Sequence, residues 1–194
     1  MKYFLMTLLI VSMMISCKKE NEKISILDNY NLSTNSETED SQGNIYSVGY
    51  IQRPDNQDTR VTKKDKNGKV IWELEHAASE TDERAILVSL DEDENPWVVF
   101  IVLGGSNNDK YITRKETSPG AFDHVFLNSF GNGGNKQVSV VTRLNPQTGK
   151  IEKGTFLTAR LSSGKTNSLI VDGIAIKDGK VALGITSGSR PPAA

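Results

Sequence analysis

The residues whose spacing comes nearest to a metal site are Asp91, Asp93 and Asn95. Their side-chain oxygens alternate along the chain, as the first ligands of a calcium-binding loop do. Such a loop also needs glycine at its sixth position and glutamate at its twelfth, where this chain has Pro96 and Val102. The stretch therefore predicts a solvated acidic turn between two strands rather than a calcium site.

Histidine and cysteine are too scarce for a metal or catalytic cluster. The chain has two histidines, His76 and His124, and one cysteine, Cys17, whereas a zinc site takes about four such ligands. His124 lies beside Asp123 in a polar stretch and could act as a base, although an exposed loop histidine is the favoured interpretation. No Gly-x-Ser-x-Gly elbow occurs. We therefore predict no catalytic residues, no metal and no cofactor.

Two groups of aromatic residues are candidates for the core or for ligand contact. Trp72 and Trp97 lie in apolar strand patterns, which predicts that they belong to the core. Four others lie in a long polar segment, residues 104–136, and these are Tyr111, Phe122, Phe126 and Phe130. Aromatic residues in such an insert either anchor it to the body or contact a ligand, and anchoring is favoured because an unanchored polar segment would be disordered.

The composition is that of a globular chain. Of its 194 residues, 37% are hydrophobic and 24% charged, so it can bury a core of ordinary size. The formal net charge is −1. Because nucleic-acid surfaces need a basic excess, we expect no nucleic-acid partner.

The N-terminus explains the single cysteine. Residues 1–16 carry one lysine and then an apolar run that ends in Ser16, which is typical of a secretory signal peptide. Met14-Ile15-Ser16-Cys17 resembles the lipobox of bacterial lipoproteins, with Met14 departing from the usual leucine. The resemblance implies that Cys17 becomes the lipid-modified first residue, carrying palmitate-type acyl chains. Residues 17–30 would then form a flexible tether, and Lys18 in place of aspartate favours the outer membrane. An ordinary signal peptide with an incidental cysteine is the alternative.

A turn followed by a strand recurs in the remaining chain. It occurs at Asp40–Tyr50, Asp91–Val102 and Lys177–Ser187, and such repetition indicates a repeat architecture. Residues 31–40 are polar and predict a poor strand. Apolar residues between turn signals predict strands over residues 45–51, 59–64, 69–75, 85–90, 97–103, 138–144, 150–158, 169–176 and 181–186. The strand at 97–103 is nearly all apolar, which predicts burial on both of its faces.

We therefore predict an all-β fold of four-stranded, propeller-like blades. The repeat domain would span residues 31–194, with units over about 31–80, 81–160 and 165–190 and the insert at 104–136. The motifs Gly43–Gly49, Lys63–Gly68, Ser118–Phe122 and Val141–Pro146 resemble the bacterial SBBP-type β-propeller repeats; the second unit departs from them at Asn95-Pro-Trp97. That resemblance implies a β-propeller in an extracytoplasmic protein.

The number of units is too small for a closed ring. About two and a half units are present, whereas a closed propeller needs at least about four blades. Three explanations remain open: a fragment of a longer propeller, blades supplied by a partner chain, or a different closure such as a sandwich. An open last sheet also predicts edge-to-edge self-association.

The resulting hypothesis is a lipid-anchored protein of the outer membrane or cell surface. It would act as a non-catalytic binding or scaffold module for protein or glycan, with the insert as its contact element. The alternative is a propeller-fold enzyme (a lyase, a hydrolase or a quinone-dependent dehydrogenase). Such an enzyme needs a central cluster of charged residues, for which the candidates are Asp82, Arg84, Arg143 and Asp172.

Overall fold

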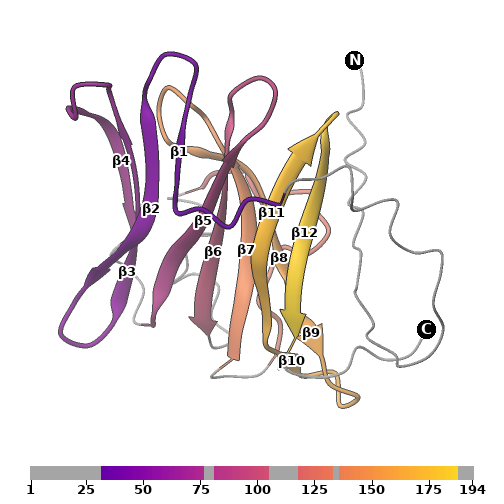
Figure 1. The fold of residues 1–194 in the computed structure, drawn as a ribbon. Coiled ribbons are helices and arrows are strands. Elements are labelled where there is room, and N and C mark those ends of the chain that lie inside the picture. Colours follow the sequence, from indigo (N-terminus) through magenta and orange to yellow (C-terminus); the bar gives the residue numbers. More distant parts are fainter. Residues whose placement is uncertain (1–31, 77–80, 105–117, 133–135, 188–194) are drawn as a thin grey trace, which may run out of the picture.

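The computed structural model describes residues 32–76, 81–104, 118–132 and 136–187. The predicted all-β class is confirmed, because these residues form strands and turns without a helix. Figure 1 shows the strands as layers that stand side by side. The predicted signal peptide, Cys17, the tether and Tyr111 lie outside the described residues.

The first sheet is an antiparallel meander in chain order. Its strands are β1 (Glu37–Glu39), β2 (Ile45–Gln52), β3 (Gln57–Lys64) and β4 (Val70–His76). The predicted strands at 45–51, 59–64 and 69–75 are thus confirmed to within two residues. Residues 31–40, which predict a poor strand, contain only the short strand β1, which pairs with β2 over three residues. Backbone ladder bonds suffice for this short strand, although both of its glutamates face away from the core.

The second sheet repeats the same meander. It contains β5 (Glu83–Leu90), β6 (Pro96–Gly104), β7 (Lys136–Leu144) and β8 (Ile151–Leu157). Burial on both faces, which the apolar run at 97–103 predicts, is observed for most of β6.

The third layer is the hairpin of β11 (Leu169–Lys177) and β12 (Lys180–Ser187), joined to β7 by one parallel bridge. A small hairpin of β9 (Ala159–Arg160) and β10 (Thr166–Asn167) precedes it. This hairpin was not predicted from the sequence, because two-residue strands are too short to show alternation.

The first two sheets match pair for pair. Thr62 of β3 lies opposite Glu73, as Thr142 of β7 lies opposite Gly154. Both ladders shift register at the same place, between Lys63 and Lys64 and between Arg143 and Leu144. A bulge is a specific feature of a strand pair, so its recurrence makes the two sheets copies of one unit.

Two cores hold the layers together, one on each face of the second sheet. The first core joins it to the first sheet and includes Tyr46, Val61 and Phe100. The second core joins it to the β11–β12 hairpin and includes Trp97 and Ile174. The second sheet is therefore the central layer.

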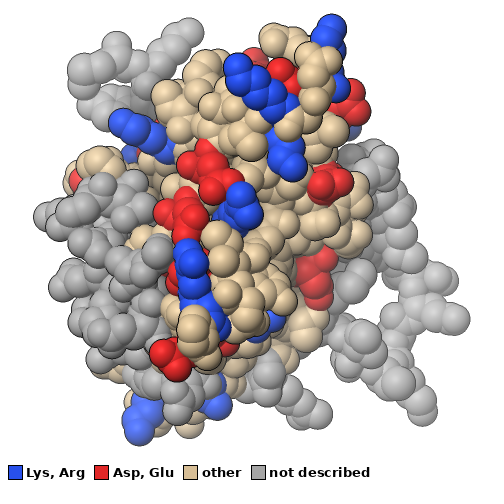
Figure 2. Space-filling view, turned by 90° about the vertical axis from the view of Figure 1, so that its left-hand side faces the viewer, with Lys and Arg blue, Asp and Glu red and all other residues tan. Residues whose placement is uncertain are grey.

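The outer face of the first sheet is charged. Arg60 pairs there with Glu73, and Arg53 with Glu75. Figure 2 shows acidic and basic side chains interspersed over this side of the molecule. The registers also show which residues of the two sheets are equivalent. Six apolar residues of the second sheet belong to the first core, and their equivalents in the first sheet lie on this outer face. In order, Val98, Phe100, Val138, Val140, Leu144 and Phe156 correspond to Ser47, Gly49, Asp58, Arg60, Lys64 and Glu75. The apolar positions of the repeat are thus polar or replaced by glycine on this face, as in the capping unit of a repeat protein.

The segment from Leu32 to Ser36 crosses all three layers, and we call it the strap. Ser33 exchanges two backbone hydrogen bonds with Ile174 of β11. The carbonyl groups of Asn35 and Ser36 then accept bonds from Val88 of β5 and Val48 of β2. The strap ties the first sheet to the last described hairpin.

Candidate functional site

The described part of the insert, residues 118–132, lies along the outer edge of β8. The amide of Gly154 donates to the carbonyl of Ala121 at 3.0 Å, and the amide of Phe156 donates to that of Leu127 at 3.0 Å. The Thr155 hydroxyl also donates to Leu127 O at 3.1 Å. These bonds use backbone groups that an edge strand would otherwise leave open.

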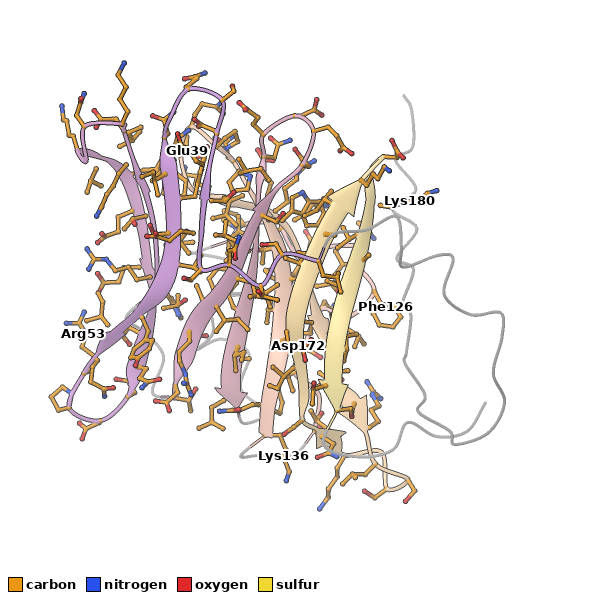
Figure 3. All side chains as sticks on the ribbon, in the orientation of Figure 1. Glu39, Arg53, Phe126, Lys136, Asp172 and Lys180 are labelled. Carbon is orange, nitrogen blue, oxygen red and sulfur yellow. The ribbon has the colours of Figure 1, made fainter. Side chains whose placement is uncertain are left out.

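The aromatic residues of this segment divide between anchoring and exposure. Phe122 and Phe130 are buried in the first core, and Gly154 leaves the space that the Phe122 ring occupies. Phe126 is 64% exposed, the highest value among the exposed large hydrophobic side chains of the described residues. It projects past the strands in Figure 3. The expected anchoring is thus observed at Phe122 and Phe130, whereas the Phe126 side chain is exposed.

The acidic stretch with calcium-like spacing is a hairpin turn. One oxygen of the Asp91 carboxylate accepts hydrogen bonds from the backbone amides of Asp93 and Asn95. The other accepts from the Trp97 indole at 3.0 Å. Glu94 adopts φ of 60° in this turn, where the matching turn of the first sheet has Gly43.

The matching turn of the first sheet is built on Asp40. Its carboxylate accepts from the amides of Gln42 and Asn44 and from the Asn44 side chain. The Tyr46 hydroxyl lies 3.4 Å from it, at the position that Trp97 has in the second turn. The two turns are thus the same device with different aromatic donors.

Asp40 also has a cationic partner. The Lys63 ammonium lies 3.3 Å from its carboxylate and donates to the carbonyl of Pro146 in the second sheet at 3.2 Å. The Trp72 indole donates to the same carbonyl at 3.0 Å. Both predicted core tryptophans, Trp72 and Trp97, are buried with their indole N–H groups satisfied.

The ionisation of this group follows from its contacts. Burial alone would raise the pKa of Asp40, but the hydrogen bonds from Asn44, Lys63 and Gln42 outweigh it, so the pKa lies below its usual value. Burial also raises the pKa of Tyr46, although Lys63 opposes that rise. The tyrosine therefore remains a neutral donor beside an ionised carboxylate.

Two glutamates of the β5–β6 turn, Glu92 and Glu94, connect it to the β11–β12 and β1–β2 turns. Glu94 accepts from the amide of Ser41 at 2.7 Å, and Glu92 from the amide of Asp178 at 2.6 Å. Figure 1 shows the β1–β2, β5–β6 and β11–β12 turns at the same end of the molecule. The carboxylates of this surface are largely engaged by backbone donors.

The two histidines have different environments. His124 is exposed in the insert, with φ of 55°. His76 is buried at the end of β4, where Nδ1 contacts the carboxylate of the fully buried Glu83. Sequence reasoning missed this pair. The sequence shows only a histidine at the end of one predicted strand and a glutamate near the start of the next. That spacing does not show that the two side chains meet.

The four charged residues considered for the central cluster of an enzyme each contact a different neighbour. Asp82 accepts from the amide of Gln57, and Arg84 lies 5.8 Å from the centre of the Tyr50 ring. Arg143 pairs with Glu152. Asp172 accepts a hydrogen bond from the Thr186 hydroxyl.

Neither a family model nor a curated protein matches the chain. Within the described ranges, no group of three or more histidine, cysteine, aspartate or glutamate residues could hold a metal ion. The same ranges contain no helix long and apolar enough to cross a membrane.

Proposed function

We propose that this chain is a lipid-anchored extracytoplasmic binding module for protein or glycan, with residues 118–132 as its contact element. The observation that carries the proposal is the exposed Phe126 on a segment fixed at both flanks. Phe122 and Phe130 are buried beside it, and backbone bonds hold it to β8. A fixed segment presents an exposed aromatic ring at a low cost in conformational entropy, which favours binding.

We further propose that the sheets are blades of an open, propeller-like stack. Support comes from the matching registers and bulges of the first two sheets. The β11–β12 hairpin packs on the next face of the central sheet, where a third blade would lie. The charged outer face of the first sheet opposes ring closure through that face, since blades pack through apolar surfaces.

The contact element is tested by replacing Phe126 with serine in the full-length chain. The matched control is Tyr50→Ser, because Tyr50 is a 48% exposed aromatic residue on another strand. Both variants would be applied to a glycan array and, after photo-cross-linking on intact cells, compared for their protein partners. We expect Phe126→Ser alone to lose at least about tenfold of the signal, as exposed aromatic anchors do. Equal signals for wild type and both variants would refute the contact role of Phe126.

The lipid anchor makes a separate prediction. Cys17→Ser should abolish incorporation of labelled palmitate and release the protein from the membrane fraction, because the thiol is the only one in the chain. The measurement is metabolic labelling followed by fractionation. A wild type that takes up no label, with a variant still bound to membranes, would contradict the lipoprotein proposal.

A further inference from the structure

A second buried polar cluster lies between the first two sheets, at the end opposite the Asp40 turn. It comprises Gln57 and Thr59 of β3, His76 of β4, and Asp82 and Glu83 where β5 begins, and we call it the His76 cluster. Thr59 and Glu83 are fully buried, and His76 is 4% exposed. Polar groups at this depth cost free energy unless they are hydrogen-bonded.

Part of the cluster is satisfied by contacts between the two sheets. His76 Nδ1 contacts a carboxylate oxygen of Glu83, and the amide of Gln57 donates to Asp82 at 3.0 Å. This contact engages Nδ1 and leaves Nε2 as the ring nitrogen that still needs a hydrogen-bond partner.

Three buried atoms of the cluster have no hydrogen-bond partner within the described residues. They are His76 Nε2, Thr59 Oγ1 and Gln57 Oε1. Thr59 is the direct cross-strand partner of His76, and such partners have side chains about 5 Å apart at Cβ. Gln57 lies two residues earlier in β3, on the same face. The three atoms therefore lie on one patch of the sheet, and all three can accept a hydrogen bond.

The matching place in the second sheet shows how that sheet satisfies the equivalent position. Register equates Thr59 with Ser139 and His76 with Leu157. The Ser139 hydroxyl accepts from the amide of Val171 at 2.8 Å and donates to Leu169 O at 3.2 Å. Backbone groups of the β11–β12 hairpin thus satisfy the Ser139 hydroxyl in the second sheet. The equivalent Thr59 hydroxyl in the first sheet has no such partner among the described residues.

We infer that the His76 cluster is a buried hydration site, in which an ordered water bridges His76 Nε2 and Thr59 Oγ1 and lies within reach of Gln57 Oε1. Buried waters make about three hydrogen bonds to groups that would otherwise be unpaired, which matches the three atoms here. Water can donate to Nε2 and to one oxygen while accepting from the threonine hydroxyl, so every group is balanced.

The site is tested first by replacing Thr59 with valine in the full-length chain. The control is Thr62→Val, the same change in the same strand on the opposite face. An unhydrated Thr59 hydroxyl would be an uncompensated buried group, so valine would raise Tm at least as much as it does at position 62. A bridging water predicts the opposite sign, with Tm of Thr59→Val below that of Thr62→Val. A rise at position 59 that equals or exceeds the control overturns the inference.

Nitrogen-15 NMR of the two histidine rings gives a second readout, with His124→Gln used for assignment. We expect a cross-relaxation peak between the His76 ring protons and a long-lived water. Loss of that peak in Thr59→Val would support the bridge. A wild-type ring without any water contact overturns it. So does a stoichiometric shift of the His76 signals on adding Zn²⁺ alone, because that result would make the cluster a metal site.

Discussion

Asp40 illustrates how one side chain can serve both a turn and the packing of two sheets. Its carboxylate closes the β1–β2 turn and also accepts the charge of Lys63, which in turn reaches Pro146 of the second sheet. Asp91 closes the equivalent turn and instead accepts from a tryptophan indole. The shared role is visible in the sequence as aspartate, asparagine and an aromatic residue at fixed spacing. The lysine is not, because it comes from another strand.

Asp40→Asn should therefore make the protein less stable in a pH-dependent way. At neutral pH the variant loses the pairing with Lys63, a cost of about 2 kcal/mol in the free energy of unfolding. The folded pKa of Asp40 lies below the usual value of 3.8, so the stabilisation is present above pH 3.8 and is lost as pH falls through the folded pKa. Urea unfolding from pH 7 to pH 2 should show the gap to wild type closing below about pH 4. A constant gap would mean that the ionised carboxylate is not the source.

At the scale of elements, the central feature is an edge strand covered by the chain itself. Residues 118–132 cover β8 through backbone hydrogen bonds and through Phe122, which fills the space above Gly154. The equivalent strand β4 itself carries Glu73 and Glu75, charges that discourage unwanted pairing. One repeat unit thus protects its edge in two ways.

Gly154→Ala should release this segment. A Cβ there would lie 2.6 Å from the Phe122 ring, and overpacking of this kind costs about 1 to 3 kcal/mol. The control is Gly49→Ala, where nothing lies within 4 Å and alanine should be neutral or stabilising by up to about 1 kcal/mol. Hydrogen exchange should rise at Gly154 and Phe156 only in the first variant. Unchanged exchange there, with an unchanged Tm, would show that the ring moves aside without cost.

The strands and most turns of this molecule were predictable, but the contacts between layers were not. Strand β2 follows from the Gly43-Asn44 turn signal and the strand-forming residues after it, and β6 follows from its nearly continuous apolar run after Asn95. The short β9–β10 hairpin and the His76–Glu83 pair escaped because each depends on neighbours that sequence spacing does not identify. The insert was recognised by its length and polarity, whereas only burial separates the anchors Phe122 and Phe130 from the exposed Phe126.

For the whole molecule, the two sides of the layered stack differ in chemistry. The first sheet repeats the backbone of the second, yet Arg60 and Glu75 occupy positions that are Val140 and Phe156 in the central layer. A face of this kind favours water over another sheet. The first sheet thus keeps the strand pairing of the second but has charged side chains at two positions that are apolar in the second.

Restoring the two apolar positions should make the protein associate. The double variant Arg60→Val with Glu75→Phe gives the outer face two residues that pack in the central sheet, and an exposed apolar patch of this kind promotes self-association. Light scattering should show a larger mass than wild type at equal concentration. The charge-neutral control Arg60→Gln with Glu75→Gln should keep the wild-type mass. If the control associates equally, loss of charge rather than apolar packing is responsible.

The strap gives the molecule a defined response to mechanical load. A pull on the chain ahead of Leu32 reaches Ser33 first, where two hydrogen bonds join it to Ile174. The same force is passed next to the bond at Val88 and then to the bond at Val48. Tension from the N-terminal side therefore loads the three layers one after another. The first hydrogen bonds to break are those between Ser33 and Ile174 of the β11–β12 hairpin.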